Sequence, residues 1–245
     1  MHGPVAPVGE EPELLPAEAF DPEGVQGVTA AAGFVVRRFG RVPYEPAWNA
    51  MRAFTDARGA HTADELWLLE HPPVFTLGQA GKPEHLLRNE GDVPMVKIDR
   101  GGQITYHGPG QLVVYLLVDL ARRGLRVREF VSLLEQALID CLASYGVCAD
   151  RREGAPGVYV DDAKIAALGL RVRNGCSYHG LSLNVDMDLA PFTWINPCGY
   201  PGLRTVQLSD FGVAEPVEAV ADRLLDHLLR LLPPLRTAGA TSPEN

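Results

Sequence analysis

A cysteine in a turn is the first candidate for chemistry in this chain of 245 residues. Cys198 stands in the segment INPCGY, between a proline and a glycine. Such neighbours exclude a helix interior or a central strand. A cysteine on a rigid, exposed turn lets a substrate reach both its sulfur and nearby backbone amides, which an acyl-transfer nucleophile requires. An incidental turn cysteine is the alternative, and local context alone leaves it open.

The other three cysteines have settings that favour different roles. Cys141 falls on the apolar stripe of a predicted helix, so we expect a buried hydrophobic residue, and we expect the same of Cys148 in the strand predicted after it. Cys176 lies three residues before His179, a spacing that suits catalysis or metal binding. No further zinc ligands accompany that pair, and no metal site is predicted. None of the four cysteines stands in a Cys-x-x-Cys pair, and no disulfide framework is expected in a reducing compartment.

A second informative segment, RGGQITYHGPGQ, starts at Arg100. It lacks the Gly-Lys-Ser/Thr of a phosphate-binding loop and does not open a helix as a dinucleotide fingerprint does. It is typical of a glycine-lined wall between two strands, where missing side chains leave room for a ligand. A pair of tight turns joining two strands is the alternative.

Hydrophobic periodicity predicts helices over residues 45–58, 128–146 and 217–232. The segment 157–173 is typical of a hairpin with Asp161 and Asp162 in its turn. Hairpin-connected strands with helices grouped between them predict an α+β fold, a mixed sheet with helices on one face. A regular βαβ winding does not fit. Further strands are predicted over residues 34–39, 65–70, 73–78, 95–100, 111–120 and 179–185.

The bulk composition predicts one cytoplasmic domain over residues 31–236, with a flexible extension over 1–30 and a flexible tail over 237–245. The start of the chain lacks the basic and apolar segments of a signal peptide, and no apolar run could span a bilayer. A net charge of −9 argues against general affinity for nucleic acid or an anionic membrane. Arginines nevertheless cluster, as solvated faces or as a docking patch for an acidic protein, at positions 122, 123, 126, 128, 151, 152, 171 and 173.

Three motifs in order give the chain its resemblance to a known family. The segments RGGQITYHGPGQ, APGVYVDDAKIAALGLRVRNGCSYHGLSLNV and INPCGY resemble the lipoyl(octanoyl) transferases, and EHPPVFTLGQAGKPEHLL is similar to the family's early segment. The likeness runs from about Glu70 to Leu208. It implies the fold of the lipoate and biotin protein ligase catalytic domains, a mixed sheet flanked by helices with an acyl tunnel.

The resemblance also implies residue roles. The family's nucleophile falls on Cys198, and its partner lysine falls on Lys164, one of three lysines in the chain. An ammonium at Lys164 would lower the pKa of the thiol from its usual value near ~8.5, and the lysine could then act as general acid and base. A solvated turn lysine is the alternative reading. Position 167 is alanine where some members have serine. The family's substrate-contact segments fall on Arg100, Gly101, Gly102, Gln103, Ile104, Thr105, Tyr106, His107, Ala167, Leu168, Gly169, Gly180, Leu181 and Ser182.

The implied reaction is a two-step acyl transfer without a cofactor. Octanoyl-acyl carrier protein is the implied donor of an octanoyl or lipoyl group. The implied acceptors are the lipoyl domains of 2-oxoacid dehydrogenase acyltransferase subunits and the glycine cleavage H protein. Alternatives are an ATP-dependent lipoate or biotin ligase, a non-catalytic module that binds lipoyl domains or carrier protein, and a cysteine hydrolase. The roles of His107 and His179, shaping the pocket or orienting loops, stay open.

Overall fold

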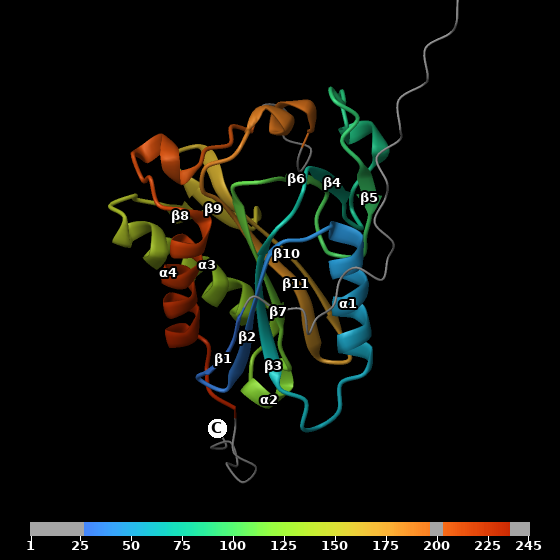
Figure 1. Ribbon diagram of the computed structural model, residues 1–245, viewed down its shortest axis with the longest axis vertical. Coiled ribbons are helices and arrows are strands. Elements are labelled where there is room, and N and C mark those ends of the chain that lie inside the picture. Colours follow the sequence, from blue (N-terminus) through green and yellow to red (C-terminus); the bar gives the residue numbers. More distant parts are fainter. Residues whose placement is uncertain (1–26, 197–202, 236–245) are drawn as a thin grey trace, which may run out of the picture.

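The computed structural model describes residues 27–196 and 203–235, which are built around an eight-stranded sheet (Figure 1). Neighbouring strands of this sheet pair antiparallel, except for β2 and β3, which are parallel. The predicted mixed sheet is therefore confirmed. Residues 1–26 and 236–245 of the expected extension and tail lie outside the described ranges, and residues 27–30 begin β1. In spatial order the strands are β1 (Gly27–Ala31), β2 (Phe34–Arg41), β3 (Asp64–Glu70), β7 (Gln111–Leu117), β11 (Cys176–Asn184), β10 (Ala163–Arg173), β9 (Gly157–Val160) and β8 (Asp150–Arg151).

A smaller sheet lies at one end of the large one, at the top of Figure 1. β4 (Val74–Leu77) is its central strand, parallel to β5 (Met95–Lys97) and antiparallel to β6 (Ile104–His107). Within the described residues, three short 3₁₀ helices complete the connections. They are η2 (Pro83–His85), η3 (Ala190–Trp194) and η5 (Leu208–Phe211).

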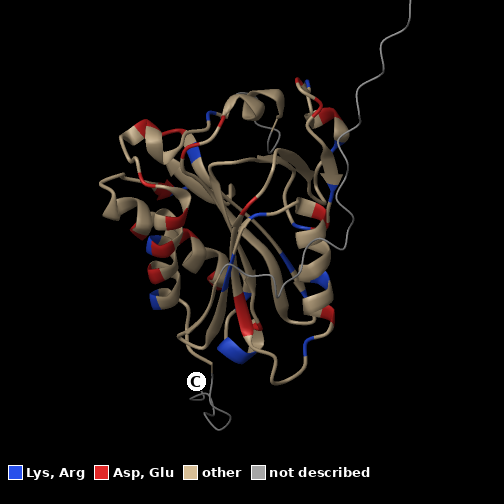
Figure 2. Cartoon of the chain, viewed as in Figure 1, with Lys and Arg blue, Asp and Glu red and all other residues tan. Residues whose placement is uncertain are grey.

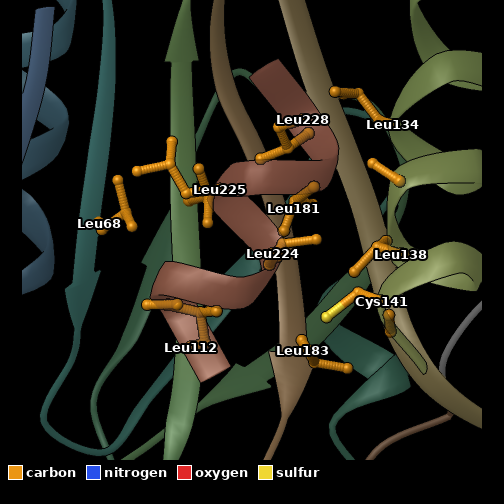
Figure 3. Close-up of a cluster of buried hydrophobic side chains, with 14 of the residues drawn as sticks. Leu68, Leu112, Leu134, Leu138, Cys141, Leu181, Leu183, Leu224, Leu225 and Leu228 are labelled. Carbon is orange, nitrogen blue, oxygen red and sulfur yellow. The ribbon is translucent and has the colours of Figure 1, made fainter. Parts of the chain in front are cut away.

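Helices cover both faces of the large sheet, which corrects the prediction of helices on one face. α3 (Val127–Ser144) and α4 (Val217–Leu231) bury leucines such as Leu138 and Leu224 against one face (Figure 3). α1 (Tyr44–Asp56) packs Met51 on the opposite face. Side chains alternate along a strand, so Leu112 faces α4 while Val113 faces α1. Because α1 joins the parallel strands β2 and β3, one βαβ unit is present after all.

The helix boundaries follow from the local sequence. α3 carries the predicted apolar stripe, and Gly146 follows it with a φ of 77°, a conformation that glycine adopts without strain. α4 starts after Pro216, which has no backbone N–H to leave unpaired. The 13 residues of α1 have Pro46 in the first turn, as predicted.

A buried ion cluster ties the start of β3 to the short helix α2 (Leu120–Arg123). Asp64 is fully buried and accepts from Arg58, from Arg122 at 2.9 Å and from Arg123 at 2.6 Å. In Figure 2 the acidic start of β3 and the basic α2 lie at the same end of the sheet. Arg122 and Arg123 therefore stabilise the fold, and Arg123, at 2% exposure, is too buried to belong to a docking patch.

Asp64→Asn is expected to lower the free energy of unfolding by about 3–5 kcal/mol, because it leaves buried guanidinium groups without their counter-ion. Urea denaturation followed by circular dichroism measures the change. Asp222→Asn is the matched control, since Asp222 pairs with Arg38 at 2.6 Å but its side chain is 64% exposed. Asp222→Asn is expected to lower the free energy of unfolding by less than about 1 kcal/mol. Equal losses in the two variants would contradict a special role of the buried cluster.

Candidate active site

The floor of a cavity is formed by three adjacent strands of the large sheet, and Val127 and Val131 at the start of α3 also line it. Strand register places residues of β7, β11 and β10 side by side in rows. One row joins Val113, Ser182 and Ala167. The next row joins Tyr115, Gly180 and Gly169, and Gln111 pairs with Asn184 at the other side. Small side chains in the middle of these rows leave the space that the cavity occupies.

The cavity, of about 320 Å³, is walled by the segment from Arg100 to His107, a loop that continues into β6. The predicted glycine wall is thus confirmed as a lining of a cavity, although substrate contact stays a prediction. Tyr106 is the exception among the predicted residues. Its ring packs against Phe75 and Phe192 beside the small sheet instead of lining the cavity. The predicted residues that line the cavity are Arg100, Gly101, Gly102, Gln103, Ile104, Thr105, His107, Lys164, Ala167, Leu168, Gly169, Gly180, Leu181 and Ser182.

The side chain of Arg100 crosses from the loop to the floor and is 8% exposed. Its guanidinium donates to the backbone oxygen and to Oγ1 of Thr76, both at 2.8 Å. A side-chain carbon at Gly169 would lie 2.8 Å from Cδ of Arg100, and one at Gly78 would lie 2.8 Å from its Nη1. The two glycines therefore make room for the arginine.

Gly169→Val is expected to displace Arg100 and to reduce octanoyl transfer about 10- to 100-fold, because a shift of about 1 Å in a lining group is enough for such a loss. Steady-state transfer to an acceptor protein measures it. Gly27→Val in the edge strand β1 is the control, since an added side-chain carbon there has no heavy atom within 4 Å. Normal transfer by a folded Gly169→Val protein would contradict the role given to this glycine.

One end of the cavity is polar but uncharged apart from Arg100. Burial, with a smaller contribution from neighbouring His71, lowers the pKa of His107 to about 3, and burial lowers that of His71 to about 4. Burial also raises the pKa values of Tyr44 and Tyr115. These rings are neutral near pH 7, so they offer hydrogen bonds without opposing a neutral acyl chain.

His179 also lies at this end, with a φ of 60° inside a strand. That conformation places His179 and Tyr178 on a shared partner, Asp99, with His179 Nε2 at 3.0 Å from the carboxylate. Burial alone would raise the pKa of Asp99, but hydrogen bonds from His179, Tyr178 and Trp48 lower it. The carboxylate is therefore ionised and orients the imidazole. No contact in the described chain joins His179 to Cys176, so the structure does not bring that pair together.

Lys164 lies on β10 toward the other end of the cavity. Leu170, the partner of His179, is six positions further along the strand, a span of up to about 20 Å at the usual rise per residue. Its Nζ donates to the backbone oxygen of Pro156 at 3.3 Å and lies 5.2 Å from the ring centre of Tyr159. A side-chain carbon at Gly157 would lie 3.3 Å from this nitrogen, so glycine keeps the space open.

The backbone of Lys164 pairs with the segment that follows the Cys198 turn in sequence. Lys164 N donates to Arg204 O at 2.8 Å, and Val206 N donates to Lys164 O at 3.0 Å. Leu203 and Thr205 of that segment line the cavity. On the other side of the turn, Asn196 N donates to His85 O at 2.8 Å. Cys198 itself lies outside the described residues.

The remaining cysteines divide into buried and exposed. Cys141 is fully buried on α3, as predicted, and burial raises the pKa of its thiol to about 12. Cys176 is buried too, and burial raises its pKa. Cys148 is exposed in the loop before β8, which corrects its predicted core position. The strand predicted around Cys148 begins only at Asp150, so Cys148 lies in a loop and packs in no sheet.

Two searches of the described part of the chain concern metals and membranes. Within residues 27–196 and 203–235, no group of three or more histidines, cysteines or acidic residues could hold a metal ion. No helix in those ranges is long and apolar enough to cross a bilayer.

Comparison with known proteins places these features in one family. Residues 43–229 match the model of the lipoyl protein ligase A/B catalytic domain. An octanoyltransferase from Azoarcus sp. (strain BH72) is 71% identical over 213 residues, which cover 86% of this chain and 94% of the relative. The chain belongs to the lipoyl(octanoyl) transferase family. The family predicted from the three motifs is thus confirmed, and with it the enzyme class, an octanoyltransferase.

Solved structures share the fold at low sequence identity. A lipoate-protein ligase A bound with ATP has a TM-score of 0.66 and 15% identity, covering 82% of this chain and 87% of the other. A bipartite lipoate protein ligase from Thermoplasma acidophilum, described with its E2 lipoyl domain, has a TM-score of 0.64 and 16% identity, covering 82% of this chain and 85% of the other. These likenesses confirm the predicted fold.

Sequence reasoning missed several residues that line the cavity or orient its walls. Gln111 and Asn184 stand inside predicted strands and face the cavity. The period of two along β11 could have found Asn184, because it puts that residue on the same face as Gly180 and Ser182. Asp99 gave no such signal, since its three hydrogen-bond donors come from distant parts of the chain.

Proposed function

We propose that this octanoyltransferase works through a thioester on Cys198, activated by Lys164. The observation that carries the proposal is the place of Lys164, which lines the cavity while its backbone pairs with Arg204 and Val206, shortly after Cys198 in sequence. One residue, Pro197, separates Cys198 from Asn196 on the other side. The family membership supports a cysteine in this turn as the nucleophile.

The first step of the proposed reaction moves the octanoyl group from octanoyl-acyl carrier protein to Cys198. The thiolate attacks the donor's thioester carbonyl, and the new carbon–sulfur bond forms as the donor's carbon–sulfur bond breaks. The carrier sulfur leaves with a proton from the Lys164 ammonium, and the lysine becomes a neutral amine. The ammonium of Lys164 stabilises the attacking thiolate. A cavity with small residues on its floor and few charges suits a medium-length acyl chain.

The second step moves the group to a lysine of the acceptor. The neutral amine attacks the acyl-enzyme, the amide bond forms, and Cys198 leaves as a thiolate while Lys164 takes the proton from the amine. The proposed acceptors are lipoyl domains of 2-oxoacid dehydrogenase acyltransferase subunits and the glycine cleavage H protein. The description of an archaeal fold relative together with its E2 lipoyl domain supports this class of acceptor. The cytoplasm suits the reaction, because it keeps a thiol nucleophile reduced.

Intact-mass spectrometry tests the proposal. The chain is mixed with octanoyl-acyl carrier protein in the absence of ATP. We expect a covalent adduct of one octanoyl group that hydroxylamine removes and that an added lipoyl domain discharges. Transfer that requires ATP would instead support a ligase. Release of free octanoate without an acceptor would support a hydrolase, and absence of any adduct would contradict the thioester route.

A further inference from the structure

Two buried amides, Gln111 and Asn184, form the centre of a hydrogen-bond chain on the cavity floor. Asn184 Nδ2 lies 3.0 Å from Val206 O, and Gln111 Nε2 lies 2.9 Å from Asn184 Oδ1 and 3.3 Å from Tyr106 O. Backbone oxygens can only accept, so Val206 and Tyr106 fix both amides with their NH₂ groups toward these oxygens. Gln111 Oε1 is therefore the acceptor for His107 Nδ1 at 2.7 Å.

The same reasoning extends the chain to the cavity wall. Because His107 donates through Nδ1 and its buried ring is neutral, Nε2 is an acceptor for Thr76 Oγ1 at 3.4 Å. Thr76 Oγ1 in turn accepts from the guanidinium of Arg100 at 2.8 Å. Every donor thus points the same way, from Arg100 to the backbone oxygen of Val206. In a chain of this kind each hydrogen bond polarises the next, so removal of one member weakens the remaining hydrogen bonds.

The far end of the hydrogen-bond chain lies at the backbone of Val206, beside Lys164. Val206 is the residue whose oxygen accepts from Asn184 and whose N–H donates to Lys164 O. Thr205, next to it, forms a parallel bridge with Lys164. Gln111 and Asn184 are 1% and 4% exposed, so water cannot replace a lost partner easily.

We propose that Gln111 and Asn184 are positioning residues that hold the strand-like segment after the Cys198 turn against Lys164, and so set the thiol and the ammonium in register. The inference rests on the proposed roles of Cys198 and Lys164. It gives the amides no direct part in the chemistry. Their effect passes through the backbone of Val206 to the two reacting side chains.

The test uses Asn184→Leu and Gln111→Met, which keep similar volume but remove the hydrogen bonds. A Cys148→Ser background removes the exposed thiol. We expect the rate of acyl-enzyme formation to fall about 10- to 100-fold in each variant. In the double variant, acyl-enzyme formation is expected to be little slower than in the slower of the two single variants. The reason is that the effects of substitutions within one hydrogen-bond network are not additive.

Alkylation of Cys198 by iodoacetamide in the free enzyme separates positioning from other roles. If the amides position the thiol, the pH midpoint of alkylation rises toward the ~8.5 of a free cysteine in both variants. If they only touched the acyl chain, KM for the donor would rise while the alkylation profile of the free enzyme stayed unchanged. That second result would overturn the inference.

Ser177→Ala is the matched control for a purely structural effect. Ser177 is fully buried on the same strand and donates to Leu116 O at 2.8 Å, away from the cavity. We expect it to lower the melting temperature without moving the alkylation midpoint. If it moves the midpoint as much as Asn184→Leu does, the inference is wrong. Wild-type protein that forms no adduct on Cys198 would instead overturn the proposed function, so the two failures are distinguishable.

Discussion

Replacement of Cys198 by alanine is expected to abolish acyl-enzyme formation and to lower octanoyl transfer by at least about 10³-fold, the order of loss seen when a nucleophile is removed. The physical reason is that the amide then has to form directly between two bound proteins, without the thioester that divides the transfer into two easier steps. Intact-mass spectrometry and a gel-shift assay of the acceptor domain measure the two effects.

Cys198→Ser and Cys148→Ser complete this experiment. The serine variant at 198 is expected to accumulate a slow oxygen ester that resists neutral hydroxylamine, since a hydroxyl is a weaker nucleophile and a poorer leaving group. Cys148→Ser changes an exposed cysteine outside the cavity and is expected to keep full transfer. A hydroxylamine-labile octanoyl adduct in Cys198→Ser would show that another thiol carries the acyl group.

Lys164→Ala is expected to raise the pH at which iodoacetamide alkylates Cys198 by about 1–3 units, because an adjacent cation favours the thiolate by that amount. The sign follows from the charge: without the ammonium, the thiolate loses its stabilising partner and forms at higher pH. Octanoyl transfer at pH 7 is expected to fall about 10²-fold or more, since the general base for the amine is lost as well.

Lys164→Arg separates the two parts of that role. A guanidinium keeps the positive charge but does not release its proton, so the alkylation midpoint is expected to stay near that of the wild type while transfer remains slow. Lys82→Ala is the control, because the side chain of Lys82 is 67% exposed and pairs with Glu84. An unchanged alkylation profile in Lys164→Ala would remove this lysine from thiol activation.

Local patterns in the sequence were sufficient to predict most of the helices and strands. The apolar stripe predicted α3, which is stabilised by burial of residues such as Phe130 and Leu138. The turn at Asp161 and Asp162 predicted the β9–β10 hairpin, and Asp161 has the positive φ that such a turn needs. These predictions succeeded because each depends on contacts between residues close together in the chain.

Predictions that depended on distant partners were weaker. Nothing near Arg123 in sequence indicated that it lies on Asp64, 59 residues away. Tyr106 was predicted as a substrate-contact residue, which stays a prediction, but no local pattern indicated that its ring packs against Phe75 on the neighbouring strand. Strand β1 was missed because its central residues are exposed and carry no apolar alternation.

By itself, the sequence determined the family, the enzyme class and the identity of the candidate pair, because these depend on residue types in ordered motifs. Only the tertiary structure decided that the segment from Arg100 to His107 covers β10 and β11 as a cavity wall, and that the backbone of Lys164 lies beside Val206. It also decided that Gln111 and Asn184 meet across two strands. The physical reason is that strand register and hydrogen-bond direction join segments that are far apart in the chain, and no local pattern records which segments will meet.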